Sequence, residues 1–167
     1  MTEPIDPQEI AACSCLRARR AARHLSRIYD NVLEPSGITA NQVGLLAKLL
    51  GAHIRGQESL PIGVLAERVG MHPSTLNRDI KPLILRGFVA EAPNPGDRRV
   101  RAVRITKKGR AALGAAIPLW RHAQAQVQDI LGIEITLSLN GLLDLVSAKL
   151  AGSSGMPFDS TKRQTAA

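Results

Sequence analysis

The chain has 167 residues, of which 44% are hydrophobic and only 2% aromatic, and its formal net charge is +8. This length fits one domain, or one domain with long dimerisation helices, and the positive charge favours an anionic partner. Scarce aromatic residues argue against a surface that stacks RNA or single-stranded bases. No apolar run reaches about 18 residues and no signal pattern is visible, so we expect a cytoplasmic protein without a membrane span.

The N-terminal segment is expected to form one long helix. Asp6 is a suitable N-cap, Pro7 fits the first helical position, and Glu9 supplies an acid in the first turn. The helix is expected to continue to about Leu33. Its apolar stripe consists of Ala11, Ala18, Ala22, Leu25, Tyr29 and Val32. A long helix with small residues on one face is suited to packing against other long helices.

Arginines are dense along this helix, with no acidic residue among them. They are Arg17, Arg19, Arg20, Arg23 and Arg27. One interpretation is a solvated face that aids solubility. The other is that some of them line a pocket for an anionic effector, such as an aromatic acid or its thioester. The candidate pocket residues are Arg19, Arg23, His24, Tyr29 and Trp120.

Both cysteines, Cys13 and Cys15, fall in the same expected helix. Residues two apart point to nearly opposite sides of a helix, so an intrachain disulfide would require that turn to unwind. No histidine lies at ligand spacing beside them, so no metal site is expected. Arg19, one turn after Cys15, favours the reactive thiolate of that cysteine. Cys15 is therefore the redox candidate, and the alternative is a cysteine that only packs.

The sequence Thr39-Ala40-Asn41-Gln42 is a capping box that opens a second helix, expected to end near Gly51. Its inward-facing residues are Val43, Leu46, Leu49 and Leu50. A polar connection over 53–59 follows. Leu60-Pro61 is expected to form a short strand that completes a sheet with a later hairpin.

Two short helices separated by a tight turn are expected next. The first has Ile62, Leu65, Ala66 and Val69 on one face and ends at Gly70; the second begins at Pro73, extends to about Arg86 and buries Leu76, Ile80, Leu83 and Ile84. Its opposite face carries Ser74, Thr75, Asn77, Arg78 and Lys81. Such groups contact base edges and phosphates in a major groove, although a solvated helix face is the alternative. We expect Pro82 to kink this helix and His72 to be a weak N-cap.

A β-hairpin is expected from Phe88–Ala92 and Val100–Thr106, joined by a turn rich in Pro, Asn and Gly. Arg98 and Arg99 near its tip are suited to phosphates or to a narrow minor groove. Asp97 is expected to orient one of these guanidinium groups by a forked hydrogen-bond pair. Residues 60–109 contain ten lysines and arginines but four acidic residues, so they carry +6 of the net charge of +8.

The C-terminal part predicts two more helices. Thr106 caps a helix that extends to about Leu131, with a kink at Pro118 and with Trp120 in the core. Gly132 ends it, and a last helix is expected from about Thr136 or Ser138 to Leu150. The tail, residues 152–167, is small and polar and is expected to be disordered.

This arrangement resembles the MarR family of bacterial transcription regulators. The resemblance covers about Cys13 to Leu150, and its specific motifs are Leu65–Gly70, Ser74-Thr75-Leu76, Gly96–Arg99, and Thr106 with Gly109. It implies a mainly α fold with a small β-hairpin wing (α+β), in which a winged helix-turn-helix is flanked by long dimerisation helices. The implied parts are an N-terminal dimerisation helix (1–36), a DNA-binding domain (37–109), C-terminal dimerisation helices (110–151) and the tail.

A branch of the family that senses organic hydroperoxides carries its reactive cysteine in the first helix. Cys15 and Tyr29 match that cysteine and one tyrosine partner, but lie about 21 Å apart along a straight helix, so they would meet only across a dimer. The other two tyrosines of that branch fall at Arg19 and Ala40 here, so both are missing. This weakens the interpretation of Cys15 as a sensor.

We therefore expect a homodimeric repressor that binds a pseudo-palindromic double-stranded operator and is released by a small anionic or aromatic effector. The alternatives are an oxidant-sensing repressor using Cys15, a winged-helix module that binds proteins without operator recognition, and a thiol-redox enzyme. No phosphate-binding Gly-rich loop, nucleophile elbow or paired carboxylates are visible, and the four histidines are scattered. We accordingly expect no enzymatic activity, no cofactor and no metal.

Overall fold

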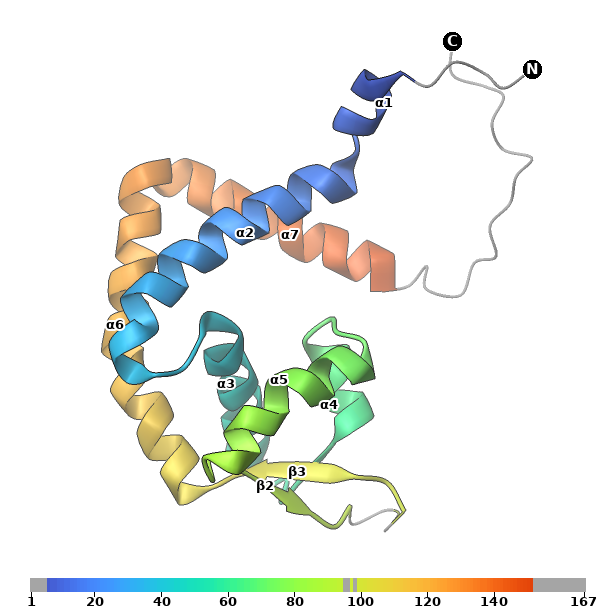
Figure 1. Cartoon of the computed structure of the whole chain (residues 1–167), viewed down its shortest axis with the longest axis vertical. Coiled ribbons are helices and arrows are strands. Elements are labelled where there is room, and N and C mark those ends of the chain that lie inside the picture. The colour runs from blue at the N-terminus through green and yellow to red at the C-terminus, as the bar shows by residue number, and fades with distance from the viewer. Residues whose placement is uncertain (1–5, 95–96, 98, 152–167) are drawn as a thin grey trace, which may run out of the picture. The chain divides into compact units, whose positions relative to one another are not determined.

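The computed structural model describes residues 6–94, 97 and 99–151 (Figure 1). Its elements in chain order are α1 (Pro7–Ala11), α2 (Ser14–Leu33), the 3-10 helix η1 (Glu34–Ser36), α3 (Ala40–Ile54), β1 (Leu60–Pro61), α4 (Ile62–Arg68), α5 (Pro73–Leu85), β2 (Val89–Ala92), β3 (Ala102–Ile105), α6 (Lys107–Leu131) and α7 (Ile133–Ala151). They form two compact units that divide between Gln126 and Val127. The expectation of a mainly α fold with a small β-hairpin wing is confirmed.

The sheet has three antiparallel strands in the order β1-β3-β2. Leu60 pairs with Val103, which confirms the short strand expected at Leu60-Pro61, and Val89 pairs with Ile105. In the central strand β3, Val103 and Ile105 are buried while Arg104 is exposed. The alternation places one face of the sheet on the core, as expected for a half-buried antiparallel sheet. Both hairpin strands are shorter than the sequence predicted.

The core of the first unit is almost entirely aliphatic. Side chains less than 2% exposed include Leu33, Leu45, Leu46, Leu65, Leu76, Ile80, Leu83, Val89 and Val103. Leu45 was not among the expected inward residues of α3. That helix contacts α2, α4, α5 and β3, so more than one stripe of it is covered.

The N-terminal helix is interrupted, so the prediction of one helix from Asp6 to Leu33 is wrong. The Asp6 cap is confirmed, since its carboxylate accepts a hydrogen bond from the Gln8 N–H, but α1 ends at Ala11. Cys13 is the N-cap of α2 with ψ 120°, and its N–H bonds to the carbonyl of Ile10. The two cysteines therefore do not lie in one helix, and the argument from their opposite directions fails.

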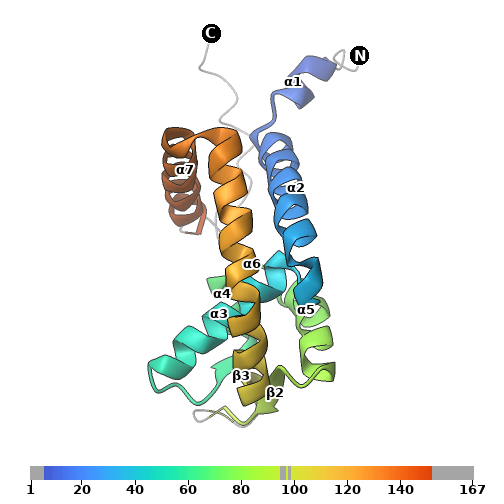
Figure 2. The ribbon, with the colours of Figure 1, turned by 90° about the vertical axis from the view of Figure 1, so that its left-hand side faces the viewer.

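Only the C-terminal half of the expected α2 stripe is covered within the chain. Leu25, Tyr29 and Val32 are half-buried, whereas Ala18 and Ala22 are exposed. Tyr29 contacts α6, which lies beside α2 (Figure 2). The N-terminal half of α2 thus offers a face of small residues without a partner in the described chain.

Thr106 and Gly109 hold the start of α6 against the backbone that follows α5. The Thr106 hydroxyl donates to the Gly87 carbonyl at 2.7 Å and accepts from the Gly109 N–H at 3.0 Å, which confirms the expected cap. A Cβ atom on Gly109 would lie 2.0 Å from the carbonyl oxygen of Phe88. The Thr–x–x–Gly spacing therefore lets a helix begin directly against backbone.

Helix α6 continues through Pro118 without interruption. Trp120 is 36% exposed and its ring centroid lies 6.4 Å from that of Tyr29, so the expectation of a core tryptophan is wrong. Gly132, at φ 77°, ends α6 as predicted, but α7 begins at Ile133, earlier than expected. The predicted disorder of residues 152–167 lies outside the described residues.

The second unit leaves most of its apolar side chains uncovered. Its exposed large hydrophobic residues are Ile130, Ile133, Ile135, Leu137, Leu142, Leu143, Leu145, Val146 and Leu150. Among the described residues, no single helix is long and apolar enough to cross a membrane; α6 and α7 meet that requirement only as a broken pair.

Candidate nucleic-acid interface

Helix α5 begins with a side-chain cap from His72. Nδ1 of His72 accepts a hydrogen bond from the Ser74 N–H at 3.3 Å and lies 2.8 Å from the Ser74 hydroxyl. The ring nitrogen thus takes the place of the side-chain oxygen of a usual N-cap. It also engages the hydroxyl of Ser74 at the point where the helix starts.

The two faces of α5 separate as predicted. Leu76, Ile80 and Leu83 are buried, and Ile84 is half-buried. On the other face Ser74, Arg78 and Lys81 are exposed, while Thr75 and Asn77 are half-buried. The Arg78 side chain is 80% exposed, and its Nε lies 3.7 Å from Asp79, so this ion pair restrains it little.

Pro82 lies inside α5, which stays one helix around it. Proline has no N–H, so the Arg78 carbonyl loses its usual helical partner. Pro82 itself is exposed, and its carbonyl still accepts from the Arg86 N–H at 3.1 Å. The ring therefore faces away from the core, where it does not disturb the buried stripe.

At the wing tip, Asp97 forms hydrogen bonds with backbone N–H groups. Its carboxylate accepts a hydrogen bond from the Arg99 N–H at 2.8 Å, and its carbonyl accepts from the Val100 N–H at 3.1 Å. A short acidic side chain easily reaches an N–H two residues on, which shapes a turn. Asp97 makes no ion pair with the exposed guanidinium of Arg99, so the expected fork is absent there. Arg98, with Pro95 and Gly96, lies outside the described residues.

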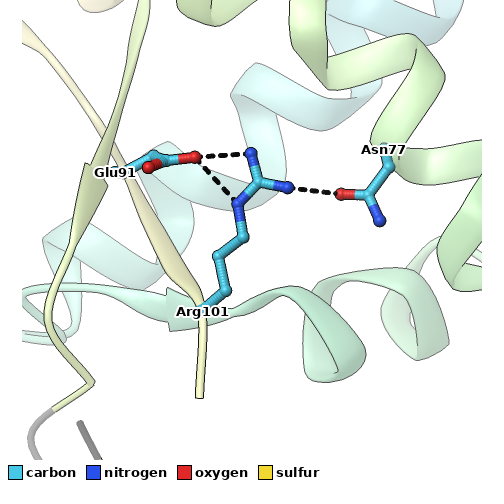
Figure 3. Close-up of polar contacts among 3 residues, drawn as sticks. All are labelled: Asn77, Glu91 and Arg101. Carbon is cyan, nitrogen blue, oxygen red and sulfur yellow. Dashed lines mark hydrogen bonds and ion pairs between the residues drawn. The ribbon is translucent and has the colours of Figure 1, made fainter. Parts of the chain in front are cut away.

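Arg101 joins the wing to α5, and the sequence analysis missed it. Its Nε and Nη2 lie 2.8 and 2.5 Å from Oε1 of Glu91, and its Nη1 donates to Oδ1 of Asn77 at 2.9 Å (Figure 3). Glu91 pairs with Val103 across the hairpin, so Arg101 is its diagonal neighbour. The diagonal position of Arg101 relative to Glu91 could have predicted this ion pair from the sequence, but only if the hairpin register had been known.

Two contacts tie the end of α2 to the rest of this unit. The Asp30 carboxylate accepts from the Ala40 N–H at 2.7 Å, at the start of α3. Arg86, the C-cap of α5, donates to the carbonyl of Gly37, and its guanidinium carbon lies 4.4 Å from the centroid of the Phe88 ring. The end of α2 is therefore bonded directly to the start of α3, while α5 is bonded to Gly37, in the connection that follows η1.

The effector candidates do not converge on one place. Arg19 and Arg23 line an open hollow of about 590 Å³ together with Arg27 and Asp30. His24 is exposed and does not line this hollow.

Tyr29 and Trp120 belong to a separate contact between α2 and α6. The Tyr29 phenol donates to Oε1 of Gln124 at 2.5 Å, and burial raises the pKa of Tyr29 above its ordinary value of 10.0. Trp120 packs against it on one side.

A further cavity of about 300 Å³ lies between α2, α3 and α5. Its polar lining includes Asp30, Thr39, Arg78 and Asp79, and Pro82 closes one side. It could not be predicted from the sequence, because its walls come from three helices, of which α5 is distant in the chain from α2 and α3. It lies beside the exposed face of α5 and shares Arg78 with it.

Cys15 lies in the first turn of α2, and both cysteines are free and exposed. Arg19, the residue expected to favour its thiolate, lines the hollow on α2. In the part of the chain that the structure describes, no group of three His, Cys, Asp or Glu side chains is placed to hold a metal ion.

Comparisons with known proteins agree on one family. The MarR family model matches residues 38–100. A crystal structure of the Mycobacterium tuberculosis transcriptional regulator MosR with DNA is 34% identical; the match covers 81% of this chain and 97% of that one, with a TM-score of 0.67. The chain belongs to the MarR family. It is therefore a DNA-binding transcriptional regulator of the winged-helix type rather than an enzyme.

Other MarR-family structures show the same fold at lower identity. A mutant of Escherichia coli MarR with operator DNA is 22% identical, has a TM-score of 0.69 and is matched over 85% of this chain and 99% of that one. Bordetella bronchiseptica BpsR, whose DNA binding is regulated by 6-hydroxynicotinic acid, is 22% identical with a TM-score of 0.69, over 87% of this chain and 98% of that one. A search of curated proteins found no match.

Proposed function

We propose that this MarR-family chain is a homodimeric, cytoplasmic repressor that binds a pseudo-palindromic operator. The observation that carries the proposal is the pairing of two basic surfaces on one compact unit: the exposed face of α5 with Arg78 and Lys81, and the wing with Arg99. A helix of this kind enters a major groove, while a wing reaches the neighbouring backbone or minor groove. Two such units related by a twofold axis would contact half-sites about one helical turn apart.

The proposed roles divide between base recognition and phosphate binding. Asn77 and Arg78 would contact base edges, whereas Lys81, Arg98 and Arg99 would bind phosphates, with Asp97 shaping the turn that presents Arg99. Ser74 and Thr75, at the start of α5, would contact the backbone where the helix meets the groove. In the division we propose, residues 37–109 bind DNA, and residues 1–36 and 110–151 form the dimer.

Gel shifts with the DNA upstream of the chain's own gene, with random duplex as competitor, test this function. Replacing Asn77 or Arg78 by Ala should reduce operator affinity about tenfold and leave random-duplex affinity nearly unchanged. Replacing Lys81 or Arg99 by Ala should weaken binding to both duplexes and reduce the salt slope by about 0.9 per lost phosphate contact. Equal affinity of the unaltered chain for both duplexes would leave a winged-helix module that binds proteins instead.

Release by a small anionic or aromatic effector is part of the proposal. The hollow at Arg19 and Arg23 is suited to a carboxylate because it holds three arginines but one acidic residue. In the same gel shifts, benzoate is a simple aromatic acid that should release the operator from the unaltered chain at millimolar concentration and not from Arg23→Ala. Peroxide in place of benzoate tests the alternative that Cys15 senses oxidants: release that Cys15→Ser abolishes would support a thiol sensor instead.

A further inference from the structure

We propose that Arg101, held by Glu91, fixes Asn77 of α5 as a hydrogen-bond donor, and that the operator therefore presents an acceptor edge, guanine first and thymine second, opposite Asn77. This inference rests on the proposed function, because it requires α5 to lie in the major groove. It goes further by naming a residue outside α5 that determines which bases the helix selects.

The chemistry of the contact determines how the Asn77 amide is oriented. A guanidinium carries five N–H donors and no acceptor, so only the carbonyl oxygen of an asparagine can face it. Nη1 of Arg101 lies 2.9 Å from Oδ1 of Asn77, which turns the NH₂ group of the amide away from the wing (Figure 3). Asn77 is half-buried rather than enclosed, and the structure gives its NH₂ group no partner among the described residues.

Glu91 holds Arg101 in this position. Oε1 of Glu91 lies within 2.8 Å of Nε and 2.5 Å of Nη2, on the side of the guanidinium away from Asn77. A carboxylate that engages two nitrogens of the planar group fixes its rotation as well as its place. Because the pair is about half-exposed, its contribution to stability is small, and its effect is geometric.

A fixed amide changes which base pairs it can recognise. A free asparagine recognises adenine by donating to N7 and accepting from the N6 amino group. With Arg101 on Oδ1, the oxygen has already accepted a strong donor, and a second amino group must approach beside a cation. Guanine instead presents two acceptors, O6 and N7, and thymine presents O4, whereas cytosine presents only an amino donor. Adenine still presents one acceptor, N7, but its amino group would then face the guanidinium of Arg101, so the held amide selects for guanine or thymine and against adenine and cytosine.

The charge of the group also separates Arg101 from the arginines that bind phosphate. Glu91 neutralises Arg101 locally, while Arg99 and Arg104 are exposed and have no acidic partner in the described chain. Removing both partners, in Arg101→Ala combined with Glu91→Gln, should therefore alter sequence preference without altering the salt dependence of binding. Removing Glu91 alone should change both properties, because it releases the hold on Arg101 and frees a cation next to the DNA.

The test is selection from a pool of random-sequence duplexes with the full chain and its variants. Asn77→Ala identifies the operator position that Asn77 contacts, since preference is lost there. At that position the unaltered chain should prefer guanine or thymine. Arg101→Ala combined with Glu91→Gln should lose that preference by about tenfold and gain adenine, with the salt slope on the selected operator unchanged. Glu91→Gln alone should weaken that preference and steepen the slope by about 0.9, as one added phosphate contact would.

Arg104→Ala is the matched control, because Arg104 is an exposed arginine of β3, three residues after Arg101, and lines a hollow with Glu58 and Lys107. It should keep the selected sequence, and thermal melts should show all variants folded. The inference is overturned if Arg101→Ala combined with Glu91→Gln retains the preference at the Asn77 position, or if that double variant weakens every duplex equally with a flatter salt slope. A chain that selects no sequence at all overturns the proposed function as well, which separates the two failures.

Discussion

Gly109 is the residue that allows α6 to start directly against the backbone of Phe88. The Thr106 N–H donates to the Phe88 carbonyl at 3.0 Å, and a Cβ atom on Gly109 would lie 2.0 Å from that same oxygen. A side chain of any size would meet backbone rather than a flexible group. The cost of a substitution here is therefore steric, and it falls on the junction between the wing and α6.

We expect Gly109→Ala to destabilise the protein by about 2 kcal/mol or more, because the added Cβ would overlap the carbonyl oxygen of Phe88. The matched control is Gly114→Ala, one to two turns later in the same helix, where a Cβ meets no atom within 4 Å. That variant should gain about 0.5–1 kcal/mol, since alanine is the better helix former. Urea unfolding followed by circular dichroism measures both, and equal stability of the two variants would contradict the prediction.

Tyr29 offers a second measurement at the level of one residue, because it is the single tyrosine of the chain. Burial raises the pKa of its phenol above 10.0. We expect its ultraviolet titration midpoint in the folded protein to exceed that of the urea-unfolded chain, with Tyr29→Phe as the blank. The folded pKa is the higher one, so the stabilisation is complete below about pH 10 and is lost as pH rises through the folded pKa. Identical midpoints would show that the phenol is not desolvated.

At the scale of elements, the sequence predicted what depends on local period and capping. Helical spacing predicts the buried stripe of Leu76, Ile80 and Leu83. The capping box at Thr39 and the break at Gly132 follow from local capping and from the freedom of glycine at positive φ. The exposed face of α5 could be predicted for the same reason, since burial of one stripe determines what the other side presents.

The predictions that were wrong, and the contacts that were not predicted, depend on residues far apart in the sequence or on breaks without a local sequence signal. The break between α1 and α2 falls at Ala12-Cys13, where neither glycine nor proline marks it. The contact of Arg101 with Asn77 joins residues 24 apart, and it exists only because the hairpin register brings Glu91 to the same guanidinium. His72 was expected to cap α5 only weakly, because Ser, Thr and Asp are preferred in that position, and the sequence does not show the bond from the Ser74 N–H to its ring.

At the scale of the whole molecule, the two ends of the chain share one property. Small residues of α2 and large aliphatic residues of α7 remain uncovered, while the unit that carries α5 and the wing has a complete core. Exposed apolar surface on this scale marks an interaction site, and its continuity along a whole helix is suited to a second copy of the same chain. This is the physical basis for the proposed homodimer.

We therefore expect Leu142→Glu to convert the protein to a monomer, as measured by sedimentation velocity. Leu142 is 60% exposed on α7, so a carboxylate is tolerated in the monomer but would be buried without a partner in a dimer. Ile54→Glu is the control, since Ile54 is 74% exposed at the end of α3 in the DNA-binding unit. It should stay dimeric. Operator affinity of the Leu142 variant should fall by about 100-fold, because the second half-site is no longer bound intramolecularly. A Leu142→Glu protein that sediments as a dimer would place the interface elsewhere.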